Sequence, residues 1–223
     1  EFENILSNQK KTGNNFGFNS GASSEVIGQY TDEYNDKIYV FITSWASDLN
    51  NPRDITAYSS GAQSGTTIIL ATSTGTVIDP QAAGIQNGML LRGETWNAAA
   101  VTVDPVVTNV TATNITIDKS ISLANLDKIV FGFANMIYEF NSNGTYKILV
   151  SGSFLNFSKK NPIYGVNKLD DLLFWTDNRN QPRKINVTLA NPTPILLPTH
   201  YQREDQISVA KYYPYEVPVV LEQ

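Results

Sequence analysis

One stretch of the chain, residues 172–187, limits its fold more than any other. It reads LLFWTDNRNQPRKINV: four apolar residues, a Thr-Asp corner, a polar turn and a second stretch that starts at Pro-Arg-Lys. Asp and Asn favour such a turn because their short side chains bond nearby backbone groups and tolerate left-handed conformations. Pro182 has no N–H to give to a strand ladder and therefore fits the start of a strand. The stretch predicts an antiparallel hairpin. The residues of this structural motif are Leu172, Phe174, Trp175, Thr176, Asp177, Pro182, Arg183 and Lys184.

The composition favours a β-rich protein that contacts other proteins. Hydrophobic residues make up 41% of the chain and charged residues only 17%, so much of the surface is neutral and polar. The net charge of −5 does not show the excess of positive charge that is typical of a nucleic-acid-binding protein. The absence of cysteine excludes disulfides and thiolate metal sites. No run approaches the roughly 18 apolar residues of a membrane helix, and we expect no membrane segment.

Two further stretches predict hairpins of the same kind. Residues 25–45 hold two strands around a polar turn, and residues 136–150 hold two strands around an Asn-Gly pair. Asn-Gly predicts a type I′ turn, because both central positions of that turn need a positive φ. Joined across the residues between them, the two stretches give four strands in meander order, which is one blade of a β-propeller. Residues 162–190 predict the start of a second blade.

The amino-acid composition changes between residues 66 and 131. Short strands rich in Val, Ile and Thr alternate with turns, and Trp96 is the only aromatic residue between Thr66 and Val130. An aromatic-poor stretch inside an aromatic-rich chain is typical of an inserted small β-module. The alternative is that these residues form further strands of the parent domain.

The predicted fold is therefore all-β, with partial β-propeller blades and an inserted small β-barrel or sandwich module. The blades are predicted over residues 25–65 and 132–190 and the module over residues 66–131. Residues 1–24 are rich in Asn, Ser and Gly and are predicted to be an N-terminal arm, with a disordered terminus as the alternative. Residues 191–223 contain repeated prolines, which favour an extended tail.

The sequence contains no recognisable catalytic, cofactor or metal motif. The single histidine, His200, lies in the proline-rich tail without a motif around it. Paired carboxylates could serve a glycosidase or hold calcium, but here each cluster lies at a predicted turn, where Asp is expected for local bonding. No calcium loop, phosphate loop or dinucleotide fingerprint is present. We predict that the chain is not an enzyme and has no cofactor. The carboxylate clusters are Asp32, Glu33 and Asp36; Asp170 and Asp171; and Glu204 and Asp205.

Two features suggest contacts with other molecules. Between Tyr146 and Lys184 seven basic residues stand against three acidic ones, and such a stripe could face a phosphate backbone or a neighbouring subunit. The candidate channel or interface residues are Lys159, Lys160, Lys168, Arg179, Arg183 and Lys184. Trp45 and Trp96 are candidates for stacking on a glycan, although tryptophan more often serves a core or an interface.

Three strings carry a resemblance to a known family: VIGQYTDEYNDKIYVFIT, IYEFNSNGTYKILVSGSFLNFSKKNPIYGVNKLDDLLFWTDNRNQPRKINV and REDQISVAKYYPYEVPVV. They resemble the tail stabilisation (nozzle or muzzle) proteins of short-tailed, crAss-like bacteriophages. Residues 156–158, 172–177 and 182–186 carry the match most specifically, and it covers roughly residues 25–45 and 136–220. The stretch 66–131 departs from that pattern and is similar instead to small β-modules inserted in many phage virion proteins.

The resemblance implies an incomplete or ring-forming β-propeller in the distal tail of the virion, made in the cytoplasm of the bacterial host. It implies a homo-oligomeric structural protein that extends the tail, lines or plugs the DNA exit path and supports fibres, without catalysis. The implied partners are other copies of the chain, other tail proteins and, non-specifically, genomic DNA in the channel. The alternative function is a carbohydrate-binding tail adhesin that recognises a host surface glycan.

Overall fold

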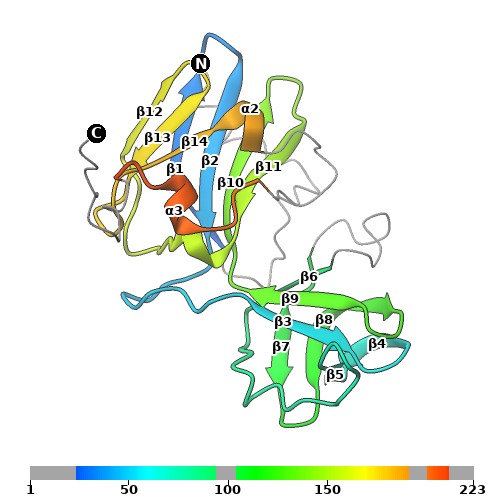
Figure 1. Ribbon diagram of the computed structural model, residues 1–223. Helices are drawn as coiled ribbons and strands as arrows, with labels where there is room; N and C mark the ends of the chain where they lie inside the picture. Colours follow the sequence, from blue (N-terminus) through cyan, green and yellow to red (C-terminus); the bar gives the residue numbers. More distant parts are fainter. Residues whose placement is uncertain (1–23, 94–103, 191–199, 211–223) are drawn as a thin grey trace, which may run out of the picture. The chain divides into compact units, whose positions relative to one another are not determined.

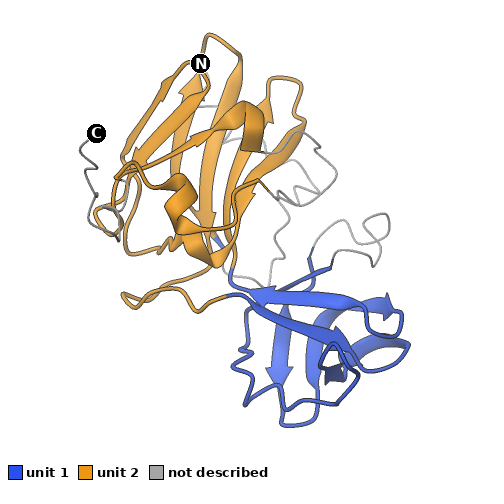
Figure 2. Ribbon diagram, viewed as in Figure 1, with its two compact units in different colours: residues 1–24, 54–133 blue, residues 25–53, 134–223 orange. Residues whose placement is uncertain are grey.

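The computed structural model describes residues 24–93, 104–190 and 200–210 (Figure 1). It is 48% strand and 7% helix, and the strands form four small antiparallel sheets, none of which is closed. The all-β prediction is confirmed, whereas the propeller blades and the barrel remain predictions. The chain divides into two compact units (Figure 2). We call Asp54–Phe133 the module, and Glu25–Arg53 together with the described residues from Ala134 onward the main unit.

The first sheet of the main unit has the strand order β1-β2-β10-β11. The meander predicted from residues 25–45 and 136–150 is thereby confirmed, with residues of the module between its second and third strands. Both faces of β2 are buried from Tyr39 to Thr43, as its continuous apolar sequence requires. The strands are β1 (Glu25–Asp32), β2 (Lys37–Thr43), β10 (Asn135–Asn141) and β11 (Tyr146–Ser151).

The turn between β10 and β11 differs from the one predicted. Gly144 has a φ of 81°, but Asn143 is not among the residues with positive φ, so the turn is not of type I′. The N–H of Gly144 bonds the carbonyl of Asn141 at 2.9 Å, and the N–H of Asn141 bonds the carbonyl of Thr145 at 2.9 Å. Only one left-handed residue is needed because the connection has three residues and ends in a glycine.

The second sheet of the main unit contains the hairpin predicted from residues 172–187. Its order is β12-β13-β14, with β12 (Gly165–Leu169), β13 (Leu172–Thr176) and β14 (Arg183–Asn186). The start of the second blade was predicted over residues 162–190, but Val187–Ala190 at its end form the helical turn α2. The Asn186 side chain accepts the N–H groups of Thr188 and Leu189, each at 3.0 Å, and so turns the chain out of the strand.

The described part of the C-terminal region lies against β14. It contains α3 (Glu204–Ile207), and Ser208 forms an isolated antiparallel bridge with Arg183. The N–H of Val209 donates to the carbonyl of Pro182 at 2.9 Å. In Figure 1 the orange-red α3 is drawn beside β14. Residues 191–199 and 211–223 of the predicted tail, and residues 1–23 of the predicted arm, lie outside the described residues.

The two sheets of the main unit share one hydrophobic core. Trp175 and Ile185 from the second sheet belong to the same buried cluster as Phe41 and Ile137 from the first. The Trp175 ring lies 5.5 Å from the ring of Phe41 and 6.4 Å from that of Phe157, measured between centroids. These contacts fix the Trp-Thr-Asp corner against the first sheet.

The module has two small sheets and a core of its own. The sheet orders are β5-β3-β9-β6 and β4-β8-β7, and the core is almost entirely aliphatic. Among the described residues its strands pair with one another and not with β2 or β11. The strands are β3 (Ile55–Ser59), β4 (Gln63–Ile68), β5 (Leu70–Ala71), β6 (Leu90–Gly93), β7 (Val107–Val110), β8 (Ile115–Leu123) and β9 (Lys128–Gly132).

The module begins earlier than residue 66, where the sequence pattern changes. β3 pairs with β9, and β4 pairs with β8, so residues 55–68 belong to the module and not to the first sheet of the main unit. These strands could not be predicted from the local sequence, because their Ser, Gly and Gln residues have low β-propensity. Their pairing also depends on partners that lie far away in the chain. Ile55 pairs with Phe131, and Thr43 pairs with Asn135. The module is therefore carried in the connection between β2 and β10.

Candidate functional site

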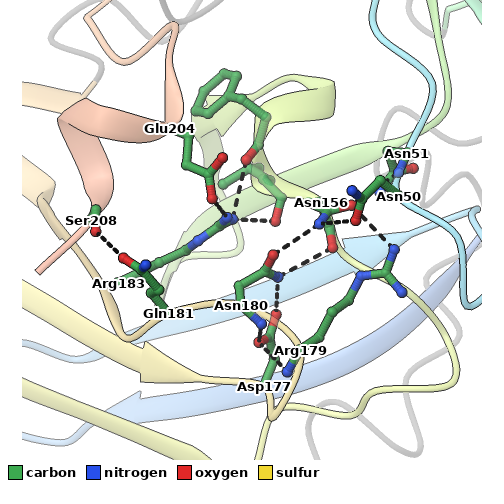
Figure 3. A network of polar contacts seen from close by, with 12 residues as sticks. Asn50, Asn51, Asn156, Asp177, Arg179, Asn180, Gln181, Arg183, Glu204 and Ser208 are labelled. Atoms are coloured by element: carbon green, nitrogen blue, oxygen red, sulfur yellow. Dashed lines mark hydrogen bonds and ion pairs between the residues drawn. The ribbon is translucent and has the colours of Figure 1, made fainter. Parts of the chain in front are cut away.

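The corner that follows β13 is organised by a buried carboxylate. Asp177 is 2% exposed. Its Oδ1 accepts the backbone N–H groups of Arg179 at 3.1 Å and Asn180 at 2.8 Å, and its Oδ2 accepts the side-chain amide of Asn180 at 2.6 Å (Figure 3). Asn178 takes a φ of 55°, which Asn tolerates better than most residues. The acid of the Trp-Thr-Asp motif thus fixes a turn.

Arg179 extends from this turn to the loop of residues 44–53, which we call the Leu49 loop. Its guanidinium donates to the carbonyls of Ser47 at 3.3 Å, Asp48 at 3.2 Å and Leu49 at 2.5 Å. It also donates to the side-chain oxygen of Asn156 at 3.2 Å. Several N–H donors in one plane allow a single arginine to hold consecutive carbonyls. Arg179 therefore ties the Leu49 loop to the second sheet.

Asn156 lies at the centre of the same network. It ends the short helix η1 (Ser153–Leu155) in a left-handed conformation with a φ of 48°. Its side-chain amide donates to the side-chain oxygens of Asn50 at 3.1 Å and Asn180 at 2.9 Å, and its oxygen accepts the N–H of Asn51 at 2.9 Å. Figure 3 shows these side chains converging from three separate parts of the chain.

Arg183 forms the second half of the network. It is 1% exposed, and its guanidinium donates to the carbonyls of Phe154 at 3.1 Å and Leu155 at 2.5 Å. It also pairs with Glu204 at 2.7 Å (Figure 3). Burial lowers the pKa of the Arg183 guanidinium, and the Glu204 carboxylate opposes that shift. A buried arginine needs such partners because an unpaired buried charge is strongly destabilising.

Four of the other lysines in the basic run have acidic partners in the chain. Lys159 pairs with Glu25 at 2.9 Å, Lys160 with Asp48 at 2.6 Å, and Lys168 with Asp32 at 2.8 Å. Lys147 pairs with Glu139 at 3.4 Å, and Lys184 is half-buried in β14. Contact of this run with DNA or with another subunit remains a prediction, but these pairs neutralise much of its charge inside the chain.

The remaining candidates are placed as follows. The half-buried Trp45 donates its indole N–H to the carbonyl of Leu49 at 2.8 Å, and Trp96 lies outside the described residues. The ring of His200 packs edge-on against Tyr201 at 4.7 Å between centroids. Within residues 24–93, 104–190 and 200–210, no group of three or more metal-ligating side chains comes together. In the same residues, no helix is long and apolar enough to cross a membrane.

The sequence predicted the turn that contains Asn180, but not the contacts of Asn50, Asn51 and Asn156. Asn51 donates to the carbonyl of Phe157, 106 residues away, and exchanges amide hydrogen bonds with the buried Asn135, 84 residues away. The sequence signal was limited to the polar residues, the proline and the glycine of residues 46–64, which suggest a loop and do not identify its partners. The arrangement holds loops together, since its amides, guanidinium groups and carboxylates bond groups of the chain itself.

Comparisons of the chain with known protein families, with curated proteins and with solved structures find no match.

Proposed function

We propose that this chain is a structural virion protein of a bacteriophage tail, of the nozzle, muzzle or stabilisation type. In this proposal it builds the distal tail around the DNA exit channel, together with other copies of itself and other tail proteins. The phage assignment is supported by the resemblance of residues 25–45 and 136–220 to that family. A mechanical role, without catalysis, is supported by the polar network of the main unit.

One observation carries the structural role. The network uses its charged and amide groups to join the Leu49 loop, η1, the corner after β13 and α3. Arg179 and Arg183 both donate to backbone carbonyls, which are fixed partners and not substrates. Loops that are held in this way keep their shape under load, as a tail component requires.

The adhesin alternative has less support from the described residues. Trp45 was a candidate glycan platform, yet it is half-buried and its indole N–H bonds the carbonyl of Leu49. A stacking platform needs a ring face that is open to solvent. Trp45 instead stabilises the Leu49 loop through this hydrogen bond.

An image of the native phage particle would test the proposal. Antibodies raised against the module would mark the chain on purified particles, and averaged images would show whether it repeats around the tail axis. We expect label at the distal tail with rotational symmetry. Label on the capsid or on free fibres, or no label on any intact particle, would contradict the proposal.

A further inference from the structure

The two ends of the module lie on neighbouring strands of one sheet. The module starts at Asp54, directly before β3, and ends at Phe133, just after β9. β3 and β9 pair with each other, and the pair nearest to these ends is Ile55 with Phe131. The ladder between the two strands stops at that pair, so any further contact between the ends depends on side chains.

Arg92 lies at this point of the module. It belongs to β6, the strand on the other side of β9, and is 5% exposed. Its Nη2 donates to the carbonyl of Phe133 at 3.3 Å. A buried positive charge needs partners, because it is strongly destabilising without them. The bond to Phe133 joins Arg92 to the end of the module.

The Asp54 carboxylate reaches the same place from the start of the module. A Cβ on Gly132 would lie 3.0 Å from Asp54 Cγ and 3.6 Å from Arg92 Nη2, and it would clash with Asp54 Oδ1. The missing side chain of Gly132 therefore leaves the space in which Asp54 approaches the guanidinium. Asp54 Oδ1 is buried, so solvent screens the attraction between these two charges only weakly.

A second carboxylate competes for the same guanidinium. Asp104 Oδ2 lies 4.0 Å from Arg92 Nε, whereas the carbonyl of Phe133 is bound at Nη2. An ionised Asp104 attracts the guanidinium toward itself and repels the Asp54 carboxylate. A neutral Asp104 leaves the guanidinium to Asp54 and Phe133.

Other charged groups lie around Asp104 in the described part of the module. Lys119 on β8 favours the ionised form of Asp104, as Arg92 does. Asp118, next to Lys119, accepts the N–H of Val106 at 2.7 Å. Burial acts against the ionised form and raises the pKa of the Asp104 carboxyl to about 6. The charge of Asp104 therefore changes between about pH 5 and about pH 7.5.

We propose that Arg92 is a latch that holds the two ends of the module together, and that the charge of Asp104 sets the strength of this latch. The latch is closed when Asp104 is neutral and loosens when Asp104 ionises. The inference concerns the module alone and does not depend on the phage assignment.

Hydrogen exchange on the full chain tests the latch. The amides of residues 54–56 and 131–133 are compared with those of β8 in the same sample, which separates local opening from global unfolding. Arg92→Met should lower the protection of the two ends several-fold and leave that of β8 unchanged. Arg53→Met, at an exposed arginine next to Asp54, is the matched control and should exchange like the parent. Unchanged protection of the ends in Arg92→Met, or an equal loss on β8, would overturn the proposal.

The parent chain itself gives a second test, which needs no change at Arg92. Rates are corrected for the intrinsic pH dependence of exchange. The protection of the two ends relative to β8 should then fall several-fold between about pH 5 and about pH 7.5. Asp104→Asn should keep the high protection at both pH values, because its side chain stays neutral. Equal protection of the parent at both pH values, or the same fall in Asp104→Asn, would overturn the control of the latch by Asp104.

Discussion

Trp175 links the two sheets of the main unit at the scale of one residue. It is 2% exposed and packs against Phe41 and Phe157 in the shared core. Replacing a buried large aromatic residue with alanine leaves a cavity and costs about 3–5 kcal/mol. We expect Trp175→Ala to lower the free energy of unfolding of the main unit by about that amount, measured by urea denaturation. A variant with an unchanged denaturation midpoint would show that the ring is not part of the core.

Asp104 in the module should make the free energy of unfolding depend on pH, and its raised pKa fixes the direction of that dependence. Its side chain is 30% exposed and its Oδ2 lies 4.0 Å from Arg92 Nε. Burial raises the pKa of the Asp104 carboxyl from 3.8 to about 6, although Arg92 and Lys119 act in the opposite direction. The folded state therefore binds this proton more tightly than the unfolded chain. The resulting stabilisation is complete below the unfolded pKa and is lost as the pH rises through the folded one.

The expected result is a difference between the parent chain and Asp104→Asn. Lowering the pH from about 7 to about 4.5 should favour the parent relative to the variant, because the variant has no proton to bind at this position. Melting of the module, followed by circular dichroism at both pH values, measures that difference. Because the Asp104 side chain is 30% exposed, solvent screening reduces the size of this stability difference. A parallel response of the two proteins would mean that the pKa of Asp104 is not raised.

At the scale of elements, residues 200–210 form an additional partner for β14. Tyr201 accepts the N–H of Asn186 on its hydroxyl at 2.8 Å, and Ile207 is fully buried in the core. Tyr201→Phe removes one hydrogen bond and leaves an N–H at the edge of the strand, which costs about 1 kcal/mol. Tyr34→Phe is the matched control, since Tyr34 is 95% exposed at a turn. Chemical denaturation should show a shift for Tyr201→Phe and none for Tyr34→Phe.

At the scale of elements, strands could be predicted from the sequence where neighbouring residues alone determine them. The apolar runs before Thr43 and Thr176 and the turns beside them predicted strands that the structure contains. Two errors came from local choices that the sequence leaves open. The Asn-Gly pair supports more than one kind of tight turn, and Val187–Ala190 turns helical because Asn186 caps it.

Long-range partners could not be predicted from one sequence. Arg179 bonds carbonyls 130–132 residues earlier in the chain, and nothing in its neighbours indicates that destination. The strands β3 and β4 became visible only through their pairing with β9 and β8. The basic run showed an excess of charge, but its acidic partners Glu25, Asp32 and Asp48 lie far away in the sequence.

At the scale of the whole molecule, the two units should be separable. The strands of the module pair among themselves and enclose their own core, while the main unit has a core of its own. We expect a chain without Asp54–Phe133, with Arg53 joined to Ala134 through a short Gly-Ser linker, to keep the main unit folded. Cooperative melting and native-like fluorescence of the two remaining tryptophans, Trp45 and Trp175, would show this. Loss of the cooperative transition would mean that the main unit needs the module to fold.

The place of the module in the chain also has a consequence for the order of folding. Thr43 and Asn135 pair across 92 positions, and closing so long an unstructured loop slows the search for that pairing. Once the module has folded, Ile55 lies opposite Phe131, and the same closure becomes that of a short loop. The module should therefore fold first and, by shortening the loop between β2 and β10, make the pairing of these two strands faster. Phe131→Ala, a change confined to the core of the module, should then slow the refolding of the main unit. A stopped-flow experiment can follow this through Trp175 in a chain whose other two tryptophans, Trp45 and Trp96, are replaced by Phe.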